Sequence, residues 1–232
     1  MHYNIGRRSH SAREGFTLVE LMLAMAFVGL LLLAIAYCII QVSNIYSKGL
    51  TLRQVNDAGR AVSDDIKRAI SGSSGPAVVT TVAAPHGSGR LCTGEYSYIW
   101  NSPDGIAAFI ATPSSTPNRY TTGTTPIRLA RVPDRDATLC ASPLQTIDSA
   151  TGVVDLLVSD DRALALYDLS VSPIGPSGMT EGLTAYGVEF TIGTSNNGAI
   201  LAGGCRPPSD AQSDALYCAI NQFAFTATKS VR

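Results

Sequence analysis

The sequence predicts an α+β fold, in which one long N-terminal α-helix packs on an antiparallel β-sheet head. Three observations predict it. Residues 21–40 form an apolar run without a charged side chain. Residues 42–70 then place apolar side chains at helical spacing. From residue 77 onward, short β-type runs alternate with clusters of Gly, Pro, Asn, Asp and Ser, which is the pattern of strands and turns.

The apolar run from Leu21 to Ile40 is long enough to cross a membrane. A helix rises about 1.5 Å per residue, so this run covers about 30 Å, the thickness of the hydrocarbon core of a bilayer. We therefore expect a single transmembrane segment here. An alternative is a removable signal peptide, because Ala34, Ile35 and Ala36 have the small-x-small form of a signal-peptidase site.

The residues before the apolar run predict its orientation. Residues 1–15 are polar and basic and include Arg7, Arg8 and Arg13. Basic residues beside a membrane segment stay on the cytoplasmic side. We therefore expect the N-terminus in the cytoplasm and the chain beyond the apolar run on the outer side of the membrane.

An ionisable side chain, Glu20, lies directly before the apolar run. A carboxylate carried to the bilayer centre costs roughly 2.5 to 3.5 kcal/mol, so acids in such segments are usually paired or functional. The simpler interpretation is that Glu20 caps the start of the helix, where the helix dipole favours an acid. Its position alone leaves both interpretations open.

The order of these features is specific: basic residues, then Gly-Phe-Thr-Leu-Val-Glu at positions 15–20, then a long apolar helix. This order resembles the prepilin signal of type IV pilins and type II secretion pseudopilins. The resemblance implies that a prepilin peptidase cuts after Gly15 and methylates the new N-terminal residue, Phe16. It also implies an assembly role for Glu20, whose carboxylate would meet the N-terminal amine of a neighbouring subunit. An ammonium and a carboxylate attract strongly at low dielectric and are costly when separated there.

In this family the helix is first a membrane anchor and then a packing rod. The resemblance therefore implies a cleaved leader (residues 1–15), a long helix (residues 16–71) with a transmembrane half (residues 21–40), and a β-rich head (residues 72–232). Its implied partners are membrane lipid before assembly, the prepilin peptidase, the inner-membrane assembly machinery and other pilin subunits. The product would be an extracellular pilus or pseudopilus that serves adhesion, motility, DNA uptake or secretion.

The large head and the stretch from Asn56 to Ile66 resemble minor pilins of the PilW type or the J-type pseudopilin, rather than a small major pilin. One departure from the family pattern is that the middle of the apolar helix has no proline, which many relatives carry. A second class of function stays open, a single-pass anchored binding protein or adhesin. An N-methylated Phe16 would favour the pilin, and an intact Met1 the anchored protein.

Beyond the membrane segment the helical pattern becomes amphipathic, so we expect this half to lie against the head of its own chain. A run from Ser71 to Pro76 ends the helix. Gly29, Gly49 and Gly59 each cost about 1 kcal/mol in a helix interior. Either the helix tolerates these glycines or packs closely against a neighbour at them, or the helix unwinds locally there when subunits pack. The apolar stripe comprises Val42, Ile45, Leu52, Val55, Val62, Ile66 and Ile70.

The head is expected to be antiparallel, because its strand-like runs leave little room for crossover helices. A Pro-Asp-Gly turn predicts a hairpin between Tyr96–Trp100 and Ile106–Ala111. A second hairpin is predicted between Val153–Val158 and Ala163–Ser172. The candidate strands are residues 78–83, 96–100, 106–111, 127–132, 153–158, 163–172, 183–193 and 220–228.

Of the five cysteines, Cys38 lies in the membrane segment and the other four lie beyond it. An even number in an exported domain predicts two disulfides. We favour Cys205 with Cys218 and Cys92 with Cys140, because this pairing needs no exchange between the two halves of the head, although three connectivities are formally possible. The pilin resemblance also implies a disulfide that ties a C-terminal loop.

Catalytic and metal chemistry have little support in the sequence. Beyond the apolar run the one histidine is His86, in a Gly-rich loop, and there is no phosphate loop, Gly-x-Ser-x-Gly elbow or zinc-type cysteine spacing. The acidic pairs Asp160/Asp161 and Asp210/Asp214 suit calcium or solvated turns. We favour turns, because neither pair has the ligand pattern of a calcium loop. We therefore expect that the chain is not an enzyme and that it binds no metal and no cofactor.

Charge gives no indication of a nucleic-acid surface. The net charge is −1, and residues 1–15 hold three arginines and one glutamate, which leaves the remaining chain near −3. Charged residues make up 15% of the chain. Together with abundant small residues, this composition is typical of exported β-rich domains. We expect no direct nucleic-acid partner.

Overall fold

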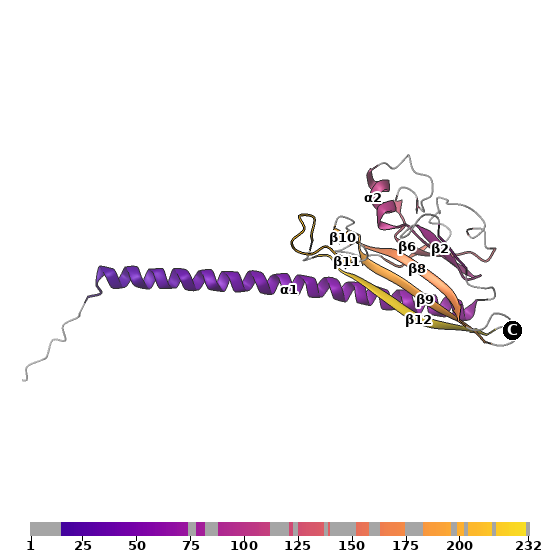
Figure 1. The fold of residues 1–232 in the computed structure, drawn as a ribbon, viewed down its shortest axis with the longest axis horizontal. Helices are drawn as coiled ribbons and strands as arrows, with labels where there is room; N and C mark the ends of the chain where they lie inside the picture. The colour runs from indigo at the N-terminus through magenta and orange to yellow at the C-terminus, as the bar shows by residue number, and fades with distance from the viewer. Residues whose placement is uncertain are drawn as a thin grey trace, which may run out of the picture. The chain divides into compact units, whose positions relative to one another are not determined.

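The fold is α+β, as the sequence predicts: one long N-terminal helix and antiparallel β-sheets (Figure 1). The contacts of the chain divide it into two compact units, residues 1–45 and residues 46–232. This computed structural model describes residues 15–73, 78–81, 88–111, 121–122, 125–136, 139, 152–157, 163–174, 183–195, 199–201, 204–214 and 217–230.

Helix α1 runs from Leu18 to Gly72, close to the predicted bounds at both ends. At its C-terminus the backbone N–H and the hydroxyl of Ser73 both donate to the carbonyl of Ile70, at 3.2 and 2.9 Å. These bonds satisfy a carbonyl that the last turn would otherwise leave unpaired. The helix therefore ends where the run of Ser, Gly and Pro predicts.

The larger sheet has five antiparallel strands, in the order β1 (Val78–Thr81), β2 (Gly89–Cys92), β3 (Tyr96–Trp100), β6 (Leu129–Pro133) and β7 (Val154–Asp155). Four of these strands overlap predicted ones, and β2 was not predicted. All four residues of β2 are buried, so its sequence shows no alternation of apolar and polar side chains.

The hairpin predicted between Tyr96–Trp100 and Ile106–Ala111 is wrong, because the second segment lies in helix α2 (Pro103–Ala111). Ser102 caps this helix: its hydroxyl accepts the N–H of Gly105 at 3.1 Å, and its carbonyl accepts the N–H of Ile106 at 2.9 Å. Proline suits the first helical position, where a missing N–H costs nothing. Pro-Asp-Gly thus begins a helix here, and β3 pairs with β2 and β6 instead.

The second sheet has three antiparallel strands, in the order β12 (Ile220–Ser230), β9 (Leu183–Thr194) and β8 (Leu164–Ile174). Their positions confirm three predicted strands. The hairpin predicted between residues 153–158 and 163–172 is wrong, because β7 pairs with β6 and β8 pairs with β9. The ladder along β8 and β9 forms many more cross-strand pairs than the two-residue β7 can offer.

Two further pairs of short strands complete the described structure. Strand β4 (Thr121–Thr122) pairs with β5 (Thr125–Pro126), and β10 (Ile200–Leu201) pairs with β11 (Gly204–Cys205). Each strand has two residues. This is too short for the alternation of side chains that identifies a strand in a sequence.

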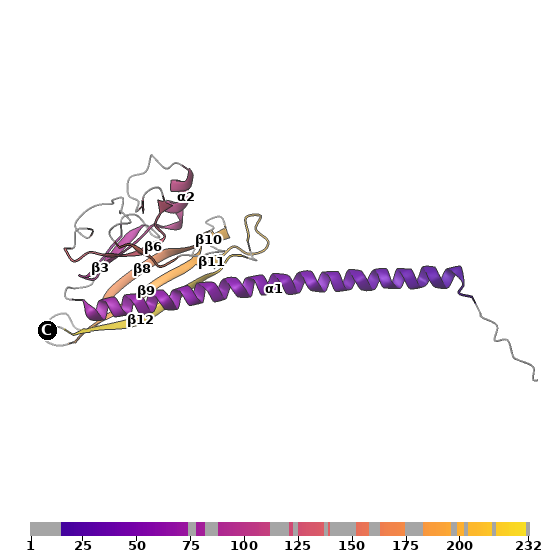
Figure 2. The same cartoon turned by 180° about the vertical axis from the view of Figure 1, so that it is seen from behind.

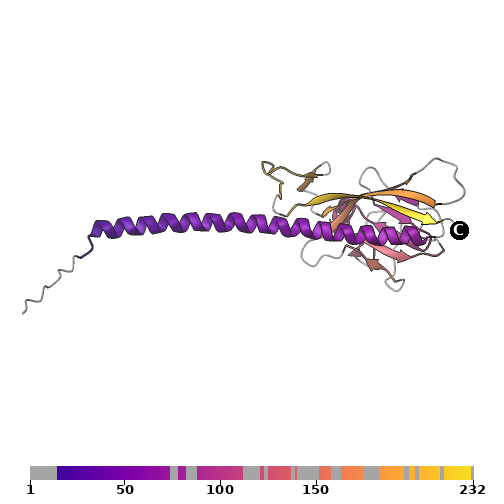
Figure 3. The same ribbon diagram turned by 90° about the horizontal axis from the view of Figure 1, so that it is seen from below.

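The C-terminal half of α1 lies in the core of the second unit. Val55, Val62, Ile66 and Ile70 are at most 1% exposed. Figures 2 and 3 show this part of the helix running along the strands. The expectation that it packs on its own head is therefore confirmed. Core side chains from the two sheets include Tyr98, Trp100, Leu129, Val188 and Phe190.

Candidate functional site

The first turn of α1 holds Glu20 in a capping box with Thr17. The backbone N–H and the hydroxyl of Thr17 both donate to Oε2 of Glu20 at 3.0 Å, and the N–H of Glu20 donates to Oγ1 of Thr17 at 3.2 Å. This arrangement satisfies N–H groups that the start of a helix leaves without a helical partner. Glu20 therefore caps α1, which is one of the two interpretations that its position allows.

The carboxylate of Glu20 keeps one oxygen available. Both donors of Thr17 reach Oε2. In the part of the chain that the structure describes, no donor reaches Oε1, and the side chain is exposed. An amine from a second molecule can therefore bind Oε1 while the capping box stays intact.

Thr17 is the residue of this site that the sequence prediction missed. The prediction assigned roles to Gly15, Phe16 and Glu20, and the structure adds Thr17 as the residue that orients the acid. A signal for it was present, because Thr-x-x-Glu before an apolar run is the capping-box pattern.

Gly15 and Phe16 lie just before the helix, and both are exposed. Phe16 is 89% exposed. A Cβ placed on Gly15 would meet no atom within 4 Å. The peptide bond between these two residues is therefore accessible to a second protein. Residues 1–14, which form the rest of the predicted leader, lie outside the described residues.

The apolar half of α1 is exposed on every face. Among the described helices α1 is long and apolar enough to cross a membrane, judged by length and composition. A helix that is apolar all round is suited to lipid, since its backbone groups bond to one another. The exposed large apolar residues between positions 21 and 40 are Leu21, Met22, Leu23, Met25, Phe27, Val28, Leu30, Leu31, Leu32, Leu33, Ile35, Tyr37, Ile39 and Ile40.

The packed half of α1 approaches β12 closely at Gly59. A Cβ at this position would lie 2.0 Å from Cζ of Phe223. The ring of Phe223 stacks on that of Phe190, with the centroids 5.2 Å apart. At Gly29 and Gly49 a Cβ would meet nothing within 4 Å. Close packing is thus confirmed for Gly59, whereas the other two glycines have no such contact with the described residues.

Asp65 joins α1 to the five-stranded sheet. Nη1 of Arg131 donates to Oδ1 of Asp65 at 2.6 Å, and the hydroxyl of Tyr98 donates to Oδ2 at 2.8 Å. The side chains of Arg131 and Asp65 are only 28% and 15% exposed. Burial, and then the neighbouring Asp65, raise the pKa of Tyr98 above its ordinary value, so the hydroxyl stays protonated as a donor. The guanidinium also lies over the ring of Tyr96, 5.0 Å from its centroid.

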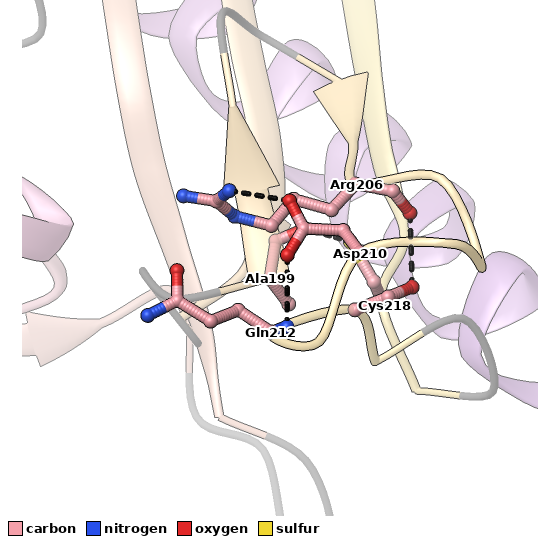
Figure 4. Close-up of polar contacts among 6 residues, drawn as sticks. Ala199, Arg206, Asp210, Gln212 and Cys218 are labelled. Carbon is pink, nitrogen blue, oxygen red and sulfur yellow. Dashed lines mark hydrogen bonds and ion pairs between the residues drawn. The ribbon is translucent and has the colours of Figure 1, made fainter.

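The disulfide between Cys205 and Cys218 closes a C-terminal loop, as the sequence predicts. Inside the loop Arg206 donates to Asp210 at 2.7 Å, and the N–H of Gln212 donates to the same carboxylate at 2.9 Å (Figure 4). The Gln212 N–H, and then Arg206, hold the pKa of Asp210 below its ordinary value. Both carboxylate oxygens therefore have partners within the loop.

The other predicted residues are described only in part. Cys92 is disulfide-bonded, and Cys38 is free and exposed. Within the described ranges no group of three or more His, Cys, Asp or Glu side chains could hold a metal ion. Four residues named in the sequence analysis lie outside the described residues: Cys140, His86, Asp160 and Asp161.

Comparisons of the chain with protein families, with characterised proteins and with solved structures find no match. The site has to be interpreted from its own chemistry. It combines an accessible Gly15–Phe16 junction, an acid in a capping box and an apolar helix that fits the thickness of a membrane.

Proposed function

We propose that this chain is a minor pilin or pilin-like subunit of a type IV pilus, which a prepilin peptidase processes and which enters an extracellular filament through α1. The observation that carries this proposal is the acid at the start of the apolar helix. Glu20 follows the accessible Gly15–Phe16 junction by about one helical turn and leads directly into the apolar segment. An acid directly beside a segment that can span a membrane is usually paired or functional.

Cleavage after Gly15 would create a new amine at Phe16, at the same end of α1 as the Glu20 carboxylate. Methylation of this amine keeps its positive charge. Because Oε1 of Glu20 has no donor among the described residues, the amine of a neighbouring subunit is a suitable partner for it. At low dielectric such a pair attracts strongly, and each subunit brings one amine and one acid to the contact.

The chemistry of the rest of the chain agrees with this role. The basic residues before α1 keep the N-terminus in the cytoplasm, so the head lies on the outer side of the membrane. The Cys205–Cys218 disulfide fits an oxidising compartment outside the cytoplasm. The assembly machinery would then extract α1 from the lipid, and the helices of neighbouring subunits would replace the lipid around it.

Two substitutions at Glu20 separate capping from charge pairing. Glutamine can still close a capping box with Thr17, but it carries no charge. We expect Glu20→Gln and Glu20→Ala both to lower the amount of the chain in sheared filaments by about tenfold or more, since close charge pairs couple by roughly 1.5 to 7 kcal/mol. Normal incorporation of Glu20→Gln would show that Glu20 acts only as a cap.

Thr17→Val is the matched control for this experiment. It removes the capping hydroxyl and keeps the charge of Glu20. Losing such a cap costs about 1 kcal/mol of helix stability, so we expect a frayed first turn and continued incorporation. Membrane insertion and formation of the Cys205–Cys218 disulfide should stay normal in all three variants, which shows that export and folding are intact.

The alternative with support in the structure is a single-pass anchored binding protein or adhesin. Its support is that Thr17 already supplies donors to Glu20, so the acid has a local role without a second subunit. Mass spectrometry of the mature N-terminus discriminates the two, because N-methyl-Phe16 is the product of pilin processing. A type II secretion pseudopilin would share this N-terminus, and it would be found in a pseudopilus rather than in sheared surface pili.

A further inference from the structure

The two edges of the three-stranded sheet are protected to different degrees. The β8 edge has a register shift between Leu166 and Asp168, carries Pro173, and lies against β1. Strand β12 pairs with β9 in one unbroken register along its whole length of 11 residues, and no other described strand pairs with its outer edge (Figure 1). It contains no proline and a single charged residue, Lys229. Edge strands without such protection are templates for pairing with another chain.

The hydrogen bonds of β9 show which groups of β12 point outward. Thr194 donates its N–H to the carbonyl of Ala219 at 2.9 Å, so this opposed pair is a hydrogen-bonded one. In an antiparallel ladder such pairs alternate with pairs whose N–H and C=O groups point away. Counting along the register places the outward N–H and C=O groups on Gln222, Ala224, Thr226 and Thr228. All four residues are exposed.

The surroundings of this edge define the chemistry of a strand that would pair with it. On the side that faces α1, Phe223 and Phe225 are only half-buried, so apolar side chains would cover them. Asn221 donates to Asn56 of α1 at 2.7 Å, which places this face of the helix beside β12. Two basic side chains lie on the same face of the helix and are exposed, one four residues after Asn56 and the other seven residues after the first. These are Arg60 and Lys67.

The acids of this part of α1 do not cancel that charge. Asp57 and Asp64 lie further round the helix from Asn56 than Arg60 and Lys67 do. Asp57 is also paired with Arg53 at 3.5 Å. The helix surface beside the outer edge of β12 is therefore basic.

We propose that the outer edge of β12 binds an extended segment of a partner chain, which adds a strand to the sheet and carries apolar and acidic side chains on the side that faces α1. Main-chain hydrogen bonds to Gln222, Ala224, Thr226 and Thr228 supply affinity, and the charges of Arg60 and Lys67 select the segment. The opposite side of the added strand faces solvent, together with the exposed side chains of Gln222, Ala224, Thr226 and Thr228.

The test uses the full chain in lipid nanodiscs and two labelled peptides as long as β12. In one peptide threonine alternates with valine or glutamate, and in the other lysine replaces glutamate. By fluorescence anisotropy at low salt we expect the glutamate peptide to bind at least about tenfold more tightly than the lysine peptide. The difference should shrink at high salt, where surface charges are screened. Equal binding of both peptides, or no binding of either, overturns the proposal.

Position 226 offers a matched pair of variants. Thr226→Pro removes an outward N–H and leaves every bond to β9 in place, and proline is tolerated on edge strands in this orientation. Thr226→Val keeps the N–H. We expect Thr226→Pro to lower the affinity for the glutamate peptide at least about fivefold, and Thr226→Val to leave this affinity unchanged. Equal affinities in the two variants contradict strand addition.

Two further measurements protect this test. If Thr226→Pro does not fold, hydrogen exchange of the unmodified chain replaces it: the amides of Gln222, Ala224, Thr226 and Thr228 should exchange fast alone and slowly with the glutamate peptide. Unchanged exchange overturns the proposal. The double variant Arg60→Glu with Lys67→Glu should prefer the lysine peptide. If the chain self-associates and Thr226→Pro abolishes this self-association, the partner at the β12 edge is a second copy of the chain and not an acidic segment of another protein.

Discussion

The two halves of α1 share one backbone conformation and have opposite surroundings. In the N-terminal half even the middle of the apolar segment is open, with Leu31 47% exposed, whereas Val55 and Ile66 in the other half are 0% exposed. The glycines differ in the same way: Gly59 lies beneath Phe223, and Gly29 has open space around it. The C-terminal half is thus packed against its own chain, whereas the apolar side chains of the N-terminal half stay exposed among the described residues.

Glu20 of the N-terminal half and Asp65 of the C-terminal half are both acids held by hydrogen bonds, but their partners differ. Asp65 accepts bonds from Arg131 and Tyr98, which belong to two different strands. Glu20 is bonded only by Thr17 within its own turn, as far as the described residues show. Asp65 therefore has a structural role that the fold explains. Glu20 has a local cap and an open oxygen, which makes it the stronger candidate for contact with a second molecule.

The largest difference between the halves should come from a charge placed in each. Leu31→Lys puts an ammonium near the middle of the apolar segment, where insertion scales assign a cost of about 3 kcal/mol. Ala61→Lys puts the same charge on an exposed face of the packed half and should change little. Glycosylation mapping of inserted chains measures the effect. A Leu31→Lys chain that inserts as well as Ala61→Lys would mean that this segment does not lie in lipid.

A smaller effect is expected at Asp65. Asp65→Asn removes the charge opposite a half-buried Arg131 and leaves one side-chain oxygen for the two donors Arg131 and Tyr98, so we expect the head to lose about 2 kcal/mol of unfolding free energy. Asp64→Asn, on the exposed face one residue away, is the control and should be neutral. Urea unfolding followed by the fluorescence of Trp100 compares them. Equal stability of the two variants would show that water already screens the Asp65–Arg131 pair.

The sequence predicted the features that depend on local chemistry. The helix bounds follow from apolar spacing and from the run beginning at Ser71. The Cys205–Cys218 bond was predicted from the even number of cysteines beyond the apolar run and from the preference for pairing within each half of the head. The strand pairings failed, because pairing depends on contacts between distant segments. Residues 103–105 are Pro-Asp-Gly, a sequence that suits a turn. They begin a helix here because Ser102 caps it.

The candidate site shows the same division between local and distant chemistry. Gly15, Phe16 and Glu20 were found from adjacent residues, and Thr17 was within reach of the capping-box pattern. The partners of Asp65 lie 33 and 66 positions further along the chain, so no spacing rule indicates them. The contact between Gly59 and Phe223 is of the same kind. A glycine in a helix suggests close packing, but only the fold identifies the ring that needs the space.

The smallest effects, and the sharpest comparison, are expected at two glycines. Alanine is favoured over glycine in a helix by about 1 kcal/mol, so Gly49→Ala should stabilise α1 by up to that amount, because its Cβ enters open space. At Gly59 the same methyl group would overlap Phe223, and overpacking costs about 1 to 3 kcal/mol. We therefore expect Gly59→Ala to be destabilising by about 1 kcal/mol after the helix gain is subtracted. Thermal unfolding of both variants measures the difference, and a stabilised Gly59→Ala would mean that Phe223 moves aside and that α1 and β12 are held less tightly than their contacts indicate.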